Sequence, residues 1–411
     1  MSLTGRMSTR PTPGGTAVRP GDEAGPVRRW SMLGASTLAQ AAAAVMVHGP
    51  AFLIPVLHGR EGLSLAAAGL VAAAPTVGIM LTLVAWGAVT DRHGERFVLV
   101  TGLVATTAAG LLAVLVGGTV PLALALVLAG AAAASTNSAS GRVVVGWFPP
   151  QRRGLAMGVR QMAQPAGVGI AAVTMPVLAD RHGVAAALWV PVVACAVAAV
   201  VVAVLVADPP RPARSGVRAA NPYRRDRFLP RVHAVSVLLV VPQFLVWTFA
   251  LVWLVQDRDW SPAAAGSLVA AAQVAGAAGR IAAGHLSDVV ASRMRPLRWV
   301  ALAAAATMAA LGLAAGLDLP LAVGLMVLAT VLTVADNGLA FTAVAERAGP
   351  FWSGRALGVQ NTAQFLTASA VPPLAGLLIA HQGYAAAFAV AAAFPAFAAV
   401  LVPVGDERGP A

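Results

Sequence analysis

Two ionisable residues stand deep within apolar stretches of this 411-residue chain. Arg160 lies in the stretch 155–179, on the order of 10 Å from the segment boundary at 1.5 Å of helix per residue, and Asp336 lies at a comparable depth in 320–345. A charge at membrane depth costs roughly 2.5–3.5 kcal/mol on insertion scales, so each needs a reason. Arg160 could hold an anionic ligand while Asp336 takes up and releases a proton. Alternatively, the two neutralise each other, or bond to backbone, and only hold helices together.

Polar side chains accompany these charges. Gln164 follows Arg160 by four residues and so shares its helix face. We expect a polar set to line a central cavity, although such residues also serve as links between helices. His48, beside a predicted kink at Gly49-Pro50, could instead meet water in an outer vestibule. The further members of the set are Gln360, Asn361, Gln364, Asn137, Asn337, Gln40, Gln243, Trp247 and Gln273.

The composition favours a membrane protein. The chain is 58% hydrophobic and 11% charged, with a mean hydropathy of +0.78, and soluble chains are near a quarter charged. All basic residues are Arg and the net charge is +12, but the Arg residues stand between apolar segments. Anionic lipid headgroups are therefore expected rather than nucleic acid. A single cysteine, Cys195, excludes an intramolecular disulfide. No nucleotide, zinc or nucleophile motif is found, so no cofactor or metal is expected and an enzyme is not favoured.

The apolar segments predict an all-α protein with twelve membrane-spanning helices. The longest break, 208–231, holds seven Arg residues and predicts a basic linker between two six-helix bundles, 30–207 and 232–404. A disordered tail is expected over 1–29 and a short one over 405–411. The predicted spans are 30–57, 65–89, 97–117, 120–146, 155–179, 184–207, 232–256, 262–286, 298–317, 320–345, 355–380 and 385–404.

The Arg distribution predicts an orientation. With the N-terminus in the cytoplasm, outer loops receive only Arg60, Arg181 and Arg258. This positive-inside bias predicts a cell-membrane protein with both termini cytoplasmic. The inner loops then receive the 211–231 cluster and Arg92, Arg96, Arg152, Arg153, Arg293, Arg295, Arg298, Arg347 and Arg355.

An internal repeat suggests movement. The loop around Asp91 returns in altered form around Asp288, 197 residues later, and Gly154-Leu155-Ala156-Met157-Gly158 returns as Gly354-Arg355-Ala356-Leu357-Gly358. Paired halves with matching charged loops suggest bundles that rock against each other, as in a transporter. Candidate gating residues are Gly87, Asp91, Arg92, Gly94, Arg96, Arg142, Gly284 and Asp288.

Physical reasons support these gating candidates. Gly87 permits close approach of two helices, and Gly94 permits a tight turn. Asp91 could cap the N-terminus of a neighbouring helix. Arg92 and Arg96 could pair with acidic groups or lipid phosphate. Arg142 and Arg280 stand near inner helix ends, where their side chains are expected to reach toward lipid phosphate.

The stretch from Gly87 to Arg96 resembles the signature loop of the major facilitator superfamily, with Val89 and Glu95 as departures. The resemblance implies two six-helix bundles around a central cavity that opens to alternate sides. It also implies that Asp91 latches against the start of the eleventh helix near Gly354, and Asp288 against the fifth near Gly154.

Secondary active transport is the predicted function, with proton-coupled uptake of an organic anion through Arg160 and Asp336. Efflux of lipophilic drug-like compounds is the alternative, although the antiporter-type pattern is only half present at Gln164-Pro165-Ala166-Gly167-Val168-Gly169. A non-transporting sensor or a membrane-embedded enzyme is less consistent with the short termini and scattered His residues. The expected partners are a small-molecule substrate, protons and membrane lipids, with the protein a monomer.

Overall fold

The computed structural model describes residues 25–63, 65–209, 221–260 and 262–407, and every regular element in these ranges is a helix. The elements are α1 (Pro26–His48), η1 (Gly49–Leu53), α2 (Ile54–Gly59), α3 (Leu65–His93), α4 (Glu95–Leu115), α5 (Thr119–Trp147), η2 (Pro150–Arg152), α6 (Arg153–Gln161), α7 (Ala163–His182), α8 (Val184–Leu205), η3 (Pro222–Arg224), α9 (Phe228–Gln256), α10 (Pro262–Val289), α11 (Met294–Gly316), α12 (Leu321–Ala348) and α13 (Ser353–Leu401).

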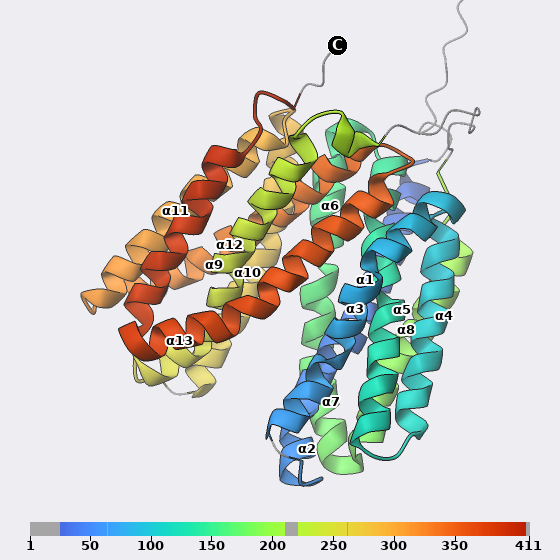
Figure 1. Cartoon of the computed structure of the whole chain (residues 1–411), viewed down its shortest axis with the longest axis horizontal. Coiled ribbons are helices and arrows are strands. Elements are labelled where there is room, and N and C mark those ends of the chain that lie inside the picture. The colour runs from blue at the N-terminus through green and yellow to red at the C-terminus, as the bar shows by residue number, and fades with distance from the viewer. Residues whose placement is uncertain (1–24, 64, 210–220, 261, 408–411) are drawn as a thin grey trace, which may run out of the picture.

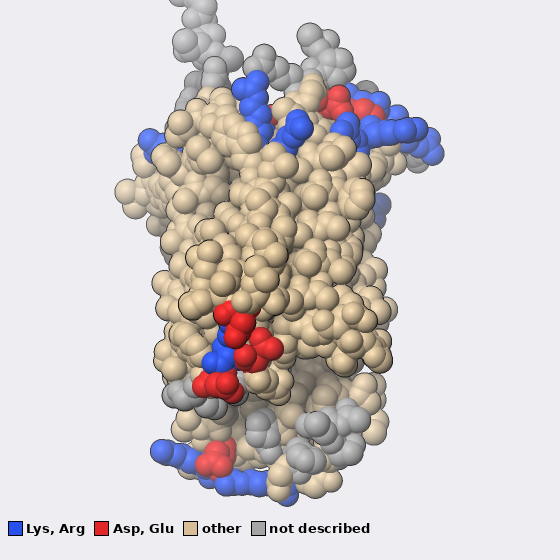
Figure 2. Space-filling view, turned by 90° about the vertical axis from the view of Figure 1, so that its left-hand side faces the viewer, with Lys and Arg blue, Asp and Glu red and all other residues tan. Residues whose placement is uncertain are grey.

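Most of these helices are long and apolar enough to cross a bilayer. Ten candidate spans are found in the described ranges, and α13 counts as one although its chain reverses at Gly383, with φ 79° and ψ 173°. The 28-residue α10 covers the remaining predicted span, 262–286, and is not among the ten. Large apolar side chains point outward, as Leu81 and Val400 show with 74% and 76% exposure. On the face seen in Figure 2, a belt without charged side chains separates two charged ends. The predicted all-helical membrane fold is confirmed.

The helices form two bundles that meet at one end (Figure 1). Elements α1 to α8 pack on one side, and α9 to α13 pack on the other. Small residues permit this packing within a bundle: a Cβ on Gly78 of α3 would lie 2.0 Å from the Val127 carbonyl oxygen of α5. Between the bundles, α3 packs against α13 and α6 against α10. The ribbons converge at the top of Figure 1 and diverge toward the bottom.

The duplication is visible in the backbone. Four of the described residues in the first half adopt a positive φ, and so do their counterparts 197 or 200 residues later. All four positions of the first half are glycine, whereas three of the four positions in the second half are residues other than glycine. The two halves therefore reverse direction at matching places. The pairs are Gly62 and Asp259, Gly94 and Ala291, Gly118 and Asp318, and Gly183 and Gly383.

The predicted tails and linker differ in extent. Most of the predicted N-terminal tail lies outside the described residues, but α1 already begins at Pro26. Likewise 210–220 of the linker lie outside, and α9 begins at Phe228, four residues before the predicted boundary. Hydrogen bonding explains the earlier start, because the Asp226 carboxylate accepts the Phe228 N–H at 2.9 Å.

Candidate functional site

Asp91, near the C-terminal end of α3, contacts the first turn of α13 in the opposite bundle. Its carboxylate accepts hydrogen bonds from the backbone N–H groups of Gly354 at 3.0 Å and Arg355 at 3.2 Å. Such N–H groups have no acceptor within their own helix and carry partial positive charge. Arg142 donates to the same carboxylate at 2.5 Å and lies 2.7 Å from Glu95. Three helices therefore meet at one buried carboxylate, which we call the Asp91 latch.

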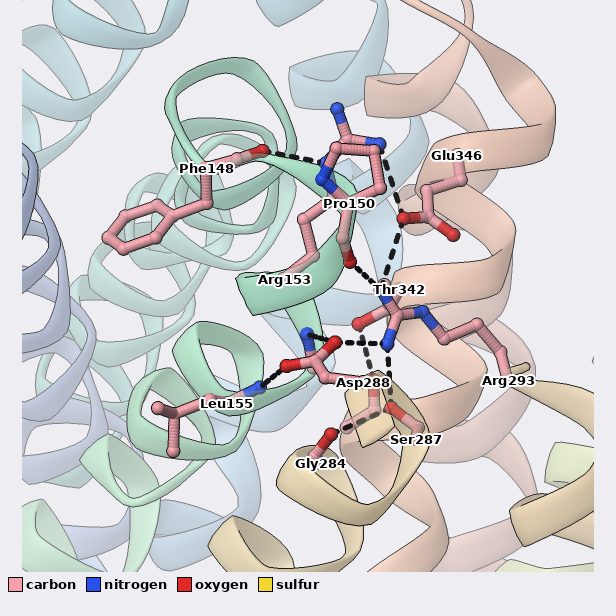
Figure 3. A network of polar contacts seen from close by, with 12 residues as sticks. Phe148, Pro150, Arg153, Leu155, Gly284, Ser287, Asp288, Arg293, Thr342 and Glu346 are labelled. Atoms are coloured by element: carbon pink, nitrogen blue, oxygen red, sulfur yellow. Dashed lines mark hydrogen bonds and ion pairs between the residues drawn. The ribbon is translucent and has the colours of Figure 1, made fainter. Parts of the chain in front are cut away.

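Asp288, near the end of α10, makes the corresponding contact with the start of α6 (Figure 3). Its two oxygens accept the N–H groups of Gly154 and Leu155, both at 2.9 Å. Arg293 donates to Asp288 and also to the Pro150 carbonyl at 2.5 Å. We call this set the Asp288 latch. Both crossed contacts implied by the resemblance are present, and their role in gating remains a prediction.

Glycine lets the bundles approach at both latches. A Cβ on Gly87 would lie 2.4 Å from the Gly354 carbonyl oxygen, and one on Gly284 would lie 2.2 Å from that of Gly154. Any side chain there would push the bundles apart. The end of the molecule that carries the two latches is therefore shut, and we call it the closed end.

The expectation that Arg142 reaches toward lipid phosphate is wrong. Its side chain is 4% exposed and points into the interface, where it also donates to the Pro350 carbonyl at 2.7 Å. The reason is charge: Asp91 and Glu95 are buried beside it and supply its counter-ions.

Three other gating candidates do not contact the opposite bundle. Gly94 reverses the chain with φ 102°. The Arg96 N–H donates to Asp208 at 2.9 Å and its guanidinium donates to the Ala203 carbonyl, both within its own bundle. Arg92 is exposed, and no hydrogen bond or ion pair joins it to another described residue.

A cavity of about 60 Å³ lies between the bundles, and polar residues from both line it. Amide pairs recur in the two halves: Gln40 donates to Asn137 at 2.9 Å, and Asn337 donates to Gln243 at 3.2 Å. The amides thus join helices and line the cavity at once. Eight predicted residues are brought together there: Gln40, Asn137, Arg160, Gln164, Gln243, Asn337, Asn361 and Gln364.

Arg160 is held firmly at the cavity wall. It is 2% exposed, donates from Nε to the Ser140 hydroxyl at 3.0 Å, and bonds to the side-chain carbonyl of Gln161. Its guanidinium lies 5.7 Å from the centre of the Phe341 ring, a cation–π distance. None of the described carboxylates lies within 4.0 Å of the guanidinium of Arg160 or of Arg280. Neither guanidinium therefore has a salt-bridge partner in the described part of the chain.

Arg280 is a second cation in this wall, which corrects the expectation that it reaches toward lipid. It is 5% exposed, lines the cavity, and donates to the Gln161 backbone carbonyl at 2.9 Å and to that of Val334 at 3.3 Å. Helix α10 continues nine residues past it to Val289, about 13 Å at 1.5 Å per residue. That distance is too great for the side chain to reach the headgroups.

Asp336 of α12 is buried beside this wall. It is 1% exposed, and within the described ranges neither carboxylate oxygen has a hydrogen-bond partner. Arg280 of α10 bonds to α12 two residues before Asp336, at the Val334 carbonyl. The reading in which Arg160 and Asp336 neutralise each other directly is not supported, because no ion pair joins them.

A larger cavity of about 470 Å³ adjoins the first, sharing Phe244, Phe365 and Ala368. His48 and Trp247 line this vestibule together with mostly apolar residues, and the His48 ring lies 3.3 Å from Gln164. Figure 2 shows the surface hollowed toward the lower end, away from the latches. The protein is thus open on one side and shut on the other.

Two predicted residues lie away from both cavities. Gln360 is buried inside its own bundle, where it bonds to His233 and Ser236. The Tyr223 hydroxyl, whose pKa burial raises to about 12, lies 2.9 Å from the same His233 ring. Gln273 is half-buried and lines neither cavity. Their assignment to substrate binding has no support from the geometry.

Sequence reasoning missed Arg280, Gln161 and three aromatic residues as parts of the wall. The aromatic residues follow the predicted amides closely: Phe244 and Phe365 are next in sequence to Gln243 and Gln364, and Phe341 lies one helical turn after Asn337. The sequence signal that could have identified these aromatic residues is their position next to, or one helical turn from, a predicted polar residue.

These features define a known class of membrane protein. The sequence profile of the Major Facilitator Superfamily matches residues 32–372, and the chain belongs to that superfamily. It is therefore a multi-pass membrane transporter.

Particular relatives can be named. The chain is 47% identical over 386 residues to an uncharacterized MFS-type transporter of Mycobacterium tuberculosis, covering 93% of this chain and 86% of the relative. It is similar to the outward conformation of FucP, the E. coli fucose:proton symporter, with a TM-score of 0.73 at 15% identity over 90% of this chain and 97% of that one. It is also similar to the human organic anion transporter MFSD10, with a TM-score of 0.73 at 17% identity over 92% and 100%. The structural similarities show a shared fold.

Proposed function

We propose that this transporter carries a small amphipathic organic anion, together with a proton, into the cell. The observation that carries the proposal is the pair of guanidinium groups, Arg160 and Arg280, in a cavity wall that contains no carboxylate among its described residues. A guanidinium matches a carboxylate or similar anion in charge and geometry.

The surroundings suit the rest of such a molecule. The amides beside the two arginines offer donors and acceptors for polar substituents, and Phe244, Phe365 and Trp247 offer apolar surface toward the vestibule. Polar groups that fix orientation beside apolar walls are typical of ligand sites. The anionic group would lie against Arg160 and the apolar part against the aromatic residues.

Asp336 is the proposed proton site. It is buried in α12 two residues after Val334, to whose carbonyl Arg280 bonds, and intramembrane carboxylates commonly mark proton relays. Arg160, Arg280 and Asp336 together carry one net positive charge. Binding one proton and one monovalent anion leaves that sum unchanged, so joint binding adds no net charge to the interior, whereas either ligand alone would.

The closed end is the proposed cytoplasmic side of the cell membrane. Arg residues such as Arg96, Arg293 and Arg355 gather there, and only Arg60, Arg181 and Arg258 stand at the other end of the described structure. With this orientation the described conformation opens outward, and uptake would begin by entry through the vestibule.

A ligand panel tests the proposed substrate class. Purified protein is heated with matched pairs of carboxylic acids of increasing chain length and their methyl esters, in the wild type and in Arg160→Ala. At least one acid should raise Tm where its ester does not, and Arg160→Ala should abolish the difference. Esters that stabilise as well as acids would refute the anion site and favour efflux of lipophilic compounds.

A further inference from the structure

Helix α6 ends at Gln161, and α7 begins two residues later at Ala163. The break leaves one carbonyl free. In a continuous helix the N–H of residue 165 would donate to the carbonyl of Gln161, but residue 165 is proline and has no N–H. The Gln161 carbonyl, at the cavity between the bundles, therefore needs a donor from elsewhere.

Arg280 supplies that donor from the opposite bundle. Its Nη1 lies 2.9 Å from the Gln161 carbonyl oxygen, and the side chain is 5% exposed. The helices are in close contact here, since a Cβ on Gly158 would lie 2.9 Å from the Arg280 carbonyl oxygen. This bond joins the bundles at the cavity itself, at a deeper level than the two latches. Opening the closed end must break it.

Two other groups compete for the same guanidinium. Asp336 belongs to the same bundle as Arg280 and stands in α12 two residues after Val334, whose carbonyl accepts a hydrogen bond from Arg280 Nε at 3.3 Å. A substrate anion in the cavity would compete from the other side. Two other ionisable groups on helices packed against α12 have bonds of their own: Arg160 of α6 bonds to Ser140, and His233 of α9 bonds to Gln360. Among the described residues, Arg280 is the cation that bonds to α12 next to Asp336, at the Val334 carbonyl.

We propose that Arg280 is the positioning residue that couples proton to substrate, by holding the Gln161 carbonyl until Asp336 or the anion draws it away. With Asp336 neutral and the cavity empty, Arg280 stays on Gln161 and the closed end stays shut, so a proton alone does not pass. An anion then recruits Arg280 and releases the bundles. In the empty carrier the ionised Asp336 recruits it instead, which permits return. The anion step rests on the proposed function, and the bond to Gln161 does not.

The test uses Pro165→Ala, which restores the N–H that competes for the Gln161 carbonyl. The reporter is Leu357→Cys in a Cys195→Ala background, because Leu357 is fully buried where α13 meets α5 across the bundles. Pro165→Ala should raise maleimide labelling of this cysteine about tenfold, as expected for loss of one charge-assisted hydrogen bond. Pro176→Ala in the same α7 is the matched control and should leave labelling unchanged. Equal labelling in the two variants would overturn the proposal.

A second arm uses Asp336→Asn, whose side chain carries no charge. Labelling without substrate should rise with pH in the reporter protein, because an ionised Asp336 draws Arg280 away, and should stay low at every pH in Asp336→Asn. The same pH response in both proteins would refute the role of Asp336 in positioning Arg280. If Pro165→Ala does not fold, the pH dependence of labelling alone decides whether the proposal stands. Neither arm contains substrate, so their failure is distinguishable from failure of the acid and ester panel.

Discussion

The closed end and the central cavity differ in how far the two halves have kept the same construction. At the closed end both halves place an Asp on two free N–H groups of the opposite bundle, and each adds an Arg that binds the Pro150 or Pro350 carbonyl. In the cavity the counterpart of Arg160 is Gln360, which points away, and Arg280 corresponds to Leu83.

The difference teaches what each region must bind. A latch binds backbone N–H groups, which every helix start provides, so the same device serves both halves. The cavity must match a molecule that has no two-fold symmetry, and its charges therefore stand on particular helices only. The amide pairs, Gln40 with Asn137 and Gln243 with Asn337, are the part of the cavity that both halves retain.

The largest effect is expected from Asp336→Asn, which changes the asymmetric region. In proteoliposomes with an inward proton gradient, accumulation of the substrate should fall to equilibrium, while exchange of substrate across the membrane continues. The reason is that exchange needs the anion site and driven uptake also needs the proton. Accumulation at the wild-type level would remove Asp336 from the coupling role.

Arg160→Ala should weaken binding of the stabilising acid by about 10- to 100-fold, the loss expected for one charge-assisted hydrogen bond to an anion. Binding of its methyl ester should change little. Titration of Tm against ligand concentration measures both. An equal loss for acid and ester would assign Arg160 to structure instead, and the cavity would then resemble the latches in needing its charge only for packing.

Gly154→Ala and Gly87→Ala should open the closed end by steric conflict. At Gly154 the new Cβ would lie 2.1 Å from the Gly284 carbonyl oxygen, so the bundles must separate. Labelling of the Leu357→Cys reporter should rise at least fivefold, by analogy with overpacking costs of about 1–3 kcal/mol. Gly169→Ala, with open space beside its Cα, is the control. A control that labels as strongly would show a general loss of packing.

The smallest effects should come from Asp91→Ala and Asp288→Ala. Each removes hydrogen bonds to two N–H groups but also removes the cost of burying a charged carboxylate, so each should raise labelling of the reporter by only about three- to tenfold. Equal values would support the equivalence of the latches. A response to only one substitution would show that the closed end, like the cavity, has become asymmetric in function.

Much of the fold and part of the site could be predicted from the sequence. Apolar segment length and Arg placement predict helix number and bundle division, because the bilayer penalises polar backbone and charge so strongly. The repeat located the Asp91 and Asp288 contacts, which depend only on helix ends. Arg280 was misplaced because a soft helix boundary at 286 made it seem near the surface. Gln360 faces His233 because side-chain direction depends on rotation about the helix axis, which a pattern that is apolar on every side does not specify.

The reversals of the chain have a consequence for folding. At Asp259, Ala291 and Asp318 the second half holds side-chain-bearing residues in the left-handed region, where the first half has glycine. Glycine samples more conformations in the unfolded chain and so forfeits more entropy when a turn is fixed. The turns of the second half carry local steric strain, but their residues lose less conformational entropy on folding. These turns are therefore stiffer than the glycine turns of the first half.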